Sequence, residues 1–107
     1  MNLKIRKARK EDLEEISQVE MSSGYHKKKF DFVPIIIKLF KDKKETIFIL
    51  VKNNIIIGYV NVKISNKIGE INFLSIVKKE QCKGFGLKLM KFILNYAKKN
   101  KCEKVIL

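Results

Sequence analysis

The sequence contains few residues of the types that most often point to a particular function. It contains no tryptophan, one proline, two cysteines and one histidine in 107 residues. Cys82, Cys102 and His26 are too few for a disulfide framework or a zinc site, so we expect reduced thiols and no bound metal. No apolar run approaches the roughly 18 residues of a membrane helix, and the charged first residues do not look like a signal peptide. These absences predict a cytoplasmic protein with no membrane partner.

Acidic residues are also scarce. Eleven Asp and Glu face 24 Lys and Arg, which gives a net charge of +13. A small basic nucleic-acid-binding protein is therefore one interpretation. The lysines are spread along the whole chain, however, and only residues 27–29 form a compact run, which favours solvated lysines and argues against nucleic acid. The positive field favours an anionic ligand. The length and a hydrophobic fraction of 46% predict one globular domain, residues 1–107.

The spacing of apolar residues changes once between Gly69 and Asn100, from the period of a strand to that of a helix. We expect the chain to be organised around this stretch. Residues 70–77 are rich in β-branched and aromatic types, which predicts a buried strand. Strict alternation places Glu70, Asn72, Leu74 and Ile76 on one face and Ile71, Phe73, Ser75 and Val77 on the other. After Gly84 and Gly86 a helical period begins, whose core-facing residues are Leu89, Met90, Ile93, Tyr96 and Ala97.

A strand, a glycine loop and a helix start together suit anion binding. The first N–H groups of a helix have no intrahelical acceptor, and glycines let a phosphate approach the main chain closely. The spacing after Gly84 fits neither a P-loop nor a dinucleotide fingerprint. A tight strand-to-helix turn without a ligand is the alternative interpretation.

The residues around the glycines resemble a known family. Residues 81–86, Gln-Cys-Lys-Gly-Phe-Gly, fit the Gln/Arg-x-x-Gly-x-Gly/Ala signature of the GNAT acetyltransferases, and residues 70–90 look especially like the histone-type lysine acetyltransferases. The resemblance implies that the loop holds the pyrophosphate of acetyl-coenzyme A (acetyl-CoA) and that the strand pairs with its pantetheine and its thioester oxygen. The cofactor-binding residues implied in this way are Leu74, Ser75, Ile76, Gln81, Cys82, Lys83, Gly84, Phe85, Gly86 and Leu87.

The rest of the chain predicts an α/β fold with a mixed, twisted sheet, in the order β-α-α-β-β-β-α-β. The expected elements are a strand around Leu3 and Ile5, helices over 11–21 and 31–42, strands over 46–52 and 55–65, and a last strand from Lys104. Asn53-Asn54 is a two-residue hairpin turn, and Gly58 suggests a bulge. Strands two to four should be antiparallel, and strands four and five parallel.

The second helix carries specific expectations. Asp31 would cap its start, Pro34 would lie in its first turn, and its buried face would be Ile35, Ile36, Leu39 and Phe40. By resemblance, the fold is truncated after the fifth strand, covering about two-thirds of the family's domain. A fragment of a longer protein, or a homodimer that completes the sheet, would explain this.

The predicted activity is transfer of an acetyl group from acetyl-CoA to a primary amine, on a protein lysine, an N-terminus or a small molecule. By resemblance Glu70 is the catalytic base; burial would raise its pKa, and a solvated strand-end carboxylate is the alternative. Tyr25 and His26 are implied substrate contacts, with a solvated loop as the alternative. Glu80 matches a loop glutamate and is expected in solvent. A non-catalytic coenzyme A-binding or regulatory module is the rival function.

Overall fold

The computed structural model describes residues 2–23 and 29–107. The strands are β1 (Leu3–Lys7), β2 (Glu45–Lys52), β3 (Ile55–Ser65), β4 (Ile68–Ile76) and β5 (Lys104–Ile106). The α-helices are α1 (Leu13–Ser23), α2 (Lys29–Lys41) and α3 (Phe85–Lys99), and short 3₁₀ turns cover Lys10–Asp12 and Lys78–Glu80. The predicted order of elements is confirmed.

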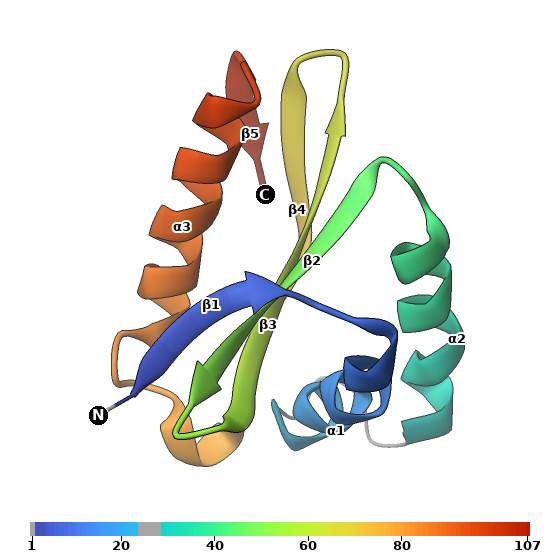
Figure 1. Cartoon of the computed structure of the whole chain (residues 1–107), viewed down its shortest axis with the longest axis vertical. Coiled ribbons are helices and arrows are strands. Elements are labelled where there is room, and N and C mark those ends of the chain that lie inside the picture. Colours follow the sequence, from blue (N-terminus) through green and yellow to red (C-terminus); the bar gives the residue numbers. More distant parts are fainter. Residues whose placement is uncertain (1, 24–28) are drawn as a thin grey trace.

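The five strands form one sheet in the order β1-β2-β3-β4-β5. Neighbouring strands from β1 to β4 are antiparallel, and β5 pairs in parallel with Ile68–Glu70 of β4. Helix α3 covers one face of the sheet, while α1 and α2 cover the other (Figure 1). This confirms the predicted mixed sheet and its parallel last pair.

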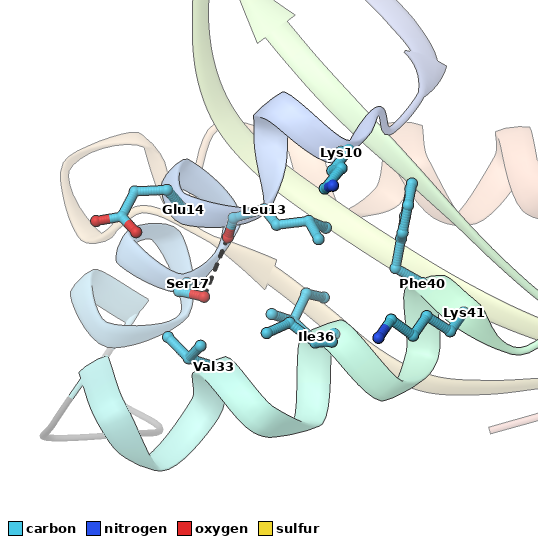
Figure 2. Close-up of a pocket in the computed structure, with 9 residues that line it drawn as sticks. Lys10, Leu13, Glu14, Ser17, Val33, Ile36, Phe40 and Lys41 are labelled. Carbon is cyan, nitrogen blue, oxygen red and sulfur yellow. Dashed lines mark hydrogen bonds between the residues drawn. The ribbon is translucent and has the colours of Figure 1, made fainter.

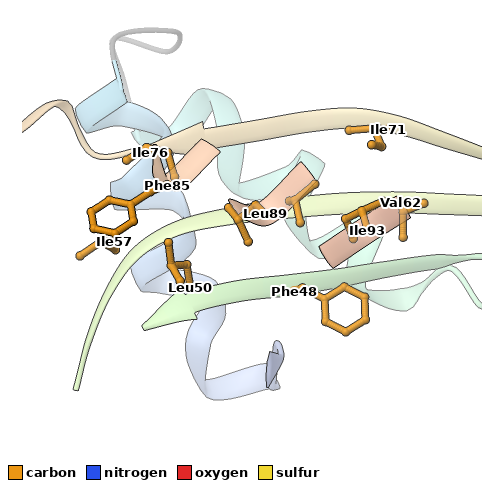
Figure 3. Packing of buried hydrophobic residues seen from close by; sticks show 10 residues of the cluster. Phe48, Leu50, Ile57, Val62, Ile71, Ile76, Phe85, Leu89 and Ile93 are labelled. Carbon is orange, nitrogen blue, oxygen red and sulfur yellow. The ribbon is translucent and has the colours of Figure 1, made fainter. Parts of the chain in front are cut away.

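Each face of the sheet has its own apolar cluster. The α3 face buries ten hydrophobic residues, nine of them labelled in Figure 3: Phe48, Leu50, Ile57, Val62, Ile71, Ile76, Phe85, Leu89 and Ile93. The α1/α2 face buries Ile16, Val19, Phe32, Ile36, Ile47, Ile49, Val51, Ile56 and Tyr59. The predicted core stripe of α3 is confirmed, since Leu89, Ile93 and Ala97 are at most 1% exposed.

The hairpin turns follow from local sequence. Asn53 and Asn54 have φ of 51° and 68°, and Asn66 and Lys67 have φ of 52° and 63°, values that a twisted two-residue hairpin needs. The bulge predicted at Gly58 is present: Leu50 pairs with Gly58 and Val51 with Ile56, so Ile57 is the extra residue. A Cβ on Gly58 would lie 3.0 Å from the carbonyl oxygen of Ser75 on the neighbouring β4, so the close approach of the two strands favours glycine at this position of β3.

A second bulge, in β4, overturns part of the predicted alternation. Asn61 pairs with Phe73 but Val62 pairs with Ile71, which leaves Asn72 as the extra residue. The side-chain pattern shifts by one at that point, so Ile71 joins the α3-face cluster together with Ile76. Glu70 alternates with Ile71 and therefore lies on the α1/α2 face, with Phe73.

Helix α2 also corrects the sequence prediction. It begins at Lys29, so Asp31 lies inside it and does not cap it, and Pro34 is its sixth residue, past the first turn. Phe32 and Ile36 are buried, whereas Ile35 and Phe40 are 36% and 37% exposed. The packing of Phe32 against Tyr59 and Phe73, at 6.0 and 5.5 Å between ring centroids, sets which side of the helix faces the sheet.

Candidate active site

The glycine loop joins the end of β4 to the start of α3. Gly84 is the residue before the helix and has φ of +86°, a left-handed conformation that glycine adopts without a Cβ penalty. Helix α3 then begins at Phe85, and Lys88 N–H is the first helical donor bonded back, to the Gly84 carbonyl at 3.1 Å. The N–H groups of Phe85, Gly86 and Leu87 precede it and have no intrahelical acceptor, so this helix start can bind an anion.

The backbone of β4 offers a second set of polar groups. Val77 N–H donates to the Ile57 carbonyl at 2.9 Å, so this pair is hydrogen-bonded across β3 and β4. Because such pairs alternate along an antiparallel ladder, Ser75 also faces β3, while Leu74 and Ile76 direct their N–H and C=O groups to the other edge. The side chain of Gln81 confirms this geometry by donating to the Ile76 carbonyl at 2.9 Å.

A cavity of about 220 Å³ lies where this strand edge meets the loop. It is lined by Leu74, Ser75, Ile76, Glu80, Gln81, Cys82, Phe85 and Gly86. Seven of the ten residues predicted to hold the cofactor are among them. Of the other three, Gly84 is at the helix start, Leu87 is 61% exposed, and Lys83 is in the loop. Strand, loop and helix start therefore converge on one cavity.

Glu80 is the main surprise of the loop. It was expected in solvent, but it is only 7% exposed and binds Lys52 at 3.0 and 3.1 Å and Lys83 at 2.9 Å. Hydrogen bonds from Lys83 and Lys52 lower the pKa of Glu80 below its ordinary value. Lys52 belongs to β2 and also lies 5.7 Å from the ring centroid of Phe85. Glu80 therefore links the loop to β2, and its carboxylate partly neutralises the charge of Lys83.

A second polar cluster lies beneath Ser75 on the α1/α2 face. Glu20, 1% exposed, accepts hydrogen bonds from the hydroxyls of Tyr59 and Ser75, both at 2.6 Å. Burial and the neighbouring carboxylate raise the pKa of Tyr59, so its hydroxyl stays protonated. Our sequence reasoning missed this cluster. The available signal was Glu20 itself, which follows Ile16 by four residues and so sits on the apolar stripe of its helix.

The predicted base, Glu70, is half-buried on the same face. Across the sheet it pairs with Lys63, which in turn pairs with Glu45. Burial, followed by the negative charge of Asp42, raises the pKa of Glu45, while Lys63 lowers it. The other predicted substrate contacts, Tyr25 and His26, lie outside the described residues.

A larger cavity, about 490 Å³, lies elsewhere, between α1 and α2. Figure 2 shows the apolar side chains of Leu13, Val33, Ile36 and Phe40 around it, with Lys10 and Lys41 at its rim. None of the predicted site residues within residues 2–23 and 29–107 lines it. Its lining is mainly apolar. The smaller cavity at the loop, by contrast, is bordered both by the edge-facing backbone N–H groups of β4 and by the start of α3. The smaller cavity is therefore the better candidate for the chemistry.

Comparison with known proteins shows the family of this chain. Residues 10–107 match the model of the acetyltransferase (GNAT) family. The histone acetyltransferase GCN5 of Oryza sativa subsp. japonica is 34% identical over 65 residues, which are 59% of this chain and 13% of that protein. The chain therefore spans only a small part of the curated relative that it matches.

Solved structures share the fold at lower identity. The GNAT family acetyltransferase of Staphylococcus aureus subsp. aureus USA300_TCH1516 superposes with a TM-score of 0.82 at 21% identity, covering 100% of this chain and 86% of that one. The PaiA N-acetyltransferase of Thermoplasma acidophilum, solved in complex with coenzyme A, gives 0.79 at 19% identity, over 95% and 76% of the two chains.

The fold is that of the solved GNAT acetyltransferase structures. Because the family model covers residues 10–107, this chain belongs to the acetyltransferase (GNAT) family. None of the helices in residues 2–23 and 29–107 combines the length and the apolar character needed to cross a membrane.

Proposed function

We propose that this domain binds acetyl-CoA along the open edge of β4 and transfers its acetyl group to a primary amine. The observation that carries the proposal is the meeting of two donor sets at one cavity: the edge-facing N–H groups of Leu74 and Ile76, and the first N–H groups of α3. A diphosphate fits the helix start because the N–H groups and the helix dipole both favour anions. The extended backbone edge suits the amides of a pantetheine arm.

The chain's own groups would then serve three steps. Leu74 N–H points to the edge where the thioester carbonyl would lie and would stabilise the oxyanion as the amine nitrogen attacks. Glu70, on the opposite face of β4 from the α3 cluster, would accept the ammonium proton directly or through water. The acetyl–sulfur bond then breaks and the thiolate leaves. When bound, acetyl-CoA supplies the activated acetyl group.

Calorimetric titration with acetyl-CoA tests the cofactor site. We expect saturable one-to-one binding by the wild type and at least about tenfold weaker binding by Gly86→Val, because its methyl groups would enter the cavity. Gly86→Ala is the matched control: its Cβ would lie 3.7 Å from Leu74 Cδ2, an ordinary contact. A folded Gly86→Val protein with wild-type affinity would remove the loop from the site.

Turnover is tested with a panel of amines: a lysine peptide with a blocked N-terminus, an alanine-starting peptide, and spermidine. Glu70→Gln should lower kcat by on the order of 100-fold while the affinity for acetyl-CoA is kept. Glu103→Gln, an exposed residue before β5, is the control. Equal kcat in both variants would exclude Glu70 as the base. Binding without acetylation of any amine would favour the coenzyme A-binding module.

The proposal also covers the kind of amine acceptor, a homodimeric assembly and a cytoplasmic location. The matched relative is named a histone acetyltransferase, whereas a net charge of +13 disfavours a strongly basic acceptor. Ile106 and Leu107 are 43% and 85% exposed at β5, where a homodimer would form. The solution mass tests the dimer. DNA binding that is salt-dependent and insensitive to Gly86→Val would instead favour the nucleic-acid interpretation.

A further inference from the structure

One buried side chain joins three strands next to the proposed site. Asn61, in the middle of β3, is 0% exposed. Its Oδ1 accepts a hydrogen bond from Phe73 N–H of β4 at 2.8 Å, and its Nδ2 donates to Oε1 of Glu45 of β2 at 2.6 Å. The amide is therefore held at both ends, and its orientation is fixed by which partner donates and which accepts.

These bonds lie at the β4 bulge. The strand pairing shifts between Asn61 and Val62, where Asn72 is the extra residue. In a regular ladder the N–H of Phe73 would bond to a backbone carbonyl of β3, whereas here a side-chain oxygen takes that place. Without this oxygen, a backbone donor inside the sheet would lose its partner, which is unfavourable because water cannot replace it there. The Asn61 side chain thus stabilises the bulge.

The bond from Asn61 anchors the amide next to the one that faces the open edge. The pairing of Ser75 and Val77 with β3 sets the alternation of residues 73–77, so Phe73 N–H turns to β3 and the next N–H, that of Leu74, turns to the edge that lines the cavity. The bulge breaks this alternation one residue before Phe73, and there the Asn61 side chain takes the place of a backbone acceptor. The position of Leu74 N–H therefore depends on the bond that Asn61 makes one residue earlier.

We propose that Asn61, oriented by Glu45, is a positioning residue for acetyl transfer: it fixes the β4 bulge and so aims Leu74 N–H at the thioester oxygen. The inference rests on the proposed function. Asn61 acts through Phe73 and the backbone and does not touch the reacting atoms. Glu45 contributes by accepting from Nδ2, which leaves Oδ1 as the only end of the amide that can serve Phe73.

Reversing the donor and the acceptor tests the pair. Asn61→Asp keeps an acceptor for Phe73 N–H but sets a second carboxylate against Glu45. We expect kcat for acetyl-CoA and the best amine of the panel to fall by about 10- to 100-fold, with the KM for acetyl-CoA within about threefold of wild type. Adding Glu45→Gln supplies an amide donor again and should restore kcat to within about threefold. Asn95→Asp, exposed on α3, is the control for the same chemical change.

A second readout does not need activity. Amide hydrogen exchange at Phe73, followed by NMR, should be faster in Asn61→Asp than in wild type and should return toward wild type in the double variant. Exchange at Phe73 that is equal in all three proteins overturns the orientation of Asn61 by Glu45, as does a folded Asn61→Asp protein with wild-type kcat. A kcat that the double variant does not recover overturns the pairing with Glu45. A wild type that binds acetyl-CoA but acetylates no amine overturns the proposed function, and with it the catalytic part of this inference, while the exchange result still tests the hold of the Asn61–Glu45 pair on Phe73.

Discussion

The two faces of this sheet are built from the same strands but hold together differently. On the α3 face the core cluster is made of apolar side chains alone, from Phe48 on β2 to Ile93 on α3. On the α1/α2 face an apolar cluster is joined by buried polar groups, among them Glu20, Asn61 and Ser75. Apolar contact is nearly non-directional, whereas a buried hydrogen bond fixes partner and geometry. Both faces are held by apolar contact, and the α1/α2 face adds buried hydrogen bonds that fix which groups lie together.

The largest loss of stability is expected from a cavity in the apolar α3 face. Leu89 is fully buried between α3 and the sheet, so Leu89→Ala should lower the free energy of unfolding by about 2–5 kcal/mol in urea denaturation. Leu94→Ala, on the same helix but 48% exposed, should change it by less than about 0.5 kcal/mol. Similar losses in the two variants would mean that α3 is not packed on the sheet as described.

The polar face is tested next, with a smaller expected effect. Tyr59→Phe removes a buried donor from the Glu20 carboxylate and should cost about 1–3 kcal/mol in the same experiment. Tyr96→Phe is the matched control, because the Tyr96 hydroxyl lies 3.5 Å from the Thr46 hydroxyl at a half-buried position. If Tyr59→Phe is no more destabilising than Tyr96→Phe, the buried polar cluster does not stabilise this face.

The smallest effect is expected at the rim of the polar face, and it depends on pH. Burial raises the pKa of Asp12, but the hydrogen bonds from the Arg6 side chain and the Arg9 N–H outweigh it, and the net pKa lies below 3.8. A lowered carboxyl pKa gives stability that is present above the ordinary pKa and lost as the pH falls through the folded value. Asp12→Asn should therefore be about 1 kcal/mol less stable than wild type at pH 7.

That difference should shrink as the pH falls from about 5 to about 3, because the wild type then loses the charge that the variant never had. Urea denaturation of both proteins at several pH values measures it. A difference that is constant across this range would show that the ion pair of Arg6 with Asp12, at 2.9 Å, does not contribute through its charge.

The parts of the fold that were predicted correctly have local causes. Both ends of strand β3 were predicted correctly. The reason is local: Asn53-Asn54 and Asn66-Lys67 adopt positive φ and form the turns on either side of an apolar run. Helix α2 was misplaced at its start and on its buried side, because the contacts of Phe32 with Tyr59 and Phe73 join segments that are distant in the sequence. The loop residues of the site were found from their motif. Glu20, Glu80 and Asn61 were not assigned structural roles, because each has a partner in another element of the fold: Ser75 for Glu20, Lys52 for Glu80 and Glu45 for Asn61.

By itself the sequence determined the order of the elements, the hairpin turns, and the strand, glycine loop and helix that form the proposed cofactor site. Each of these depends on residues close together in the chain, where periodicity and backbone preference act directly. Only the tertiary structure decided the bulge at Asn72, and with it the face on which Glu70 lies. A bulge depends on which residues of two strands pair, and here a side chain from a third segment, Glu45, fixes that pairing through Asn61.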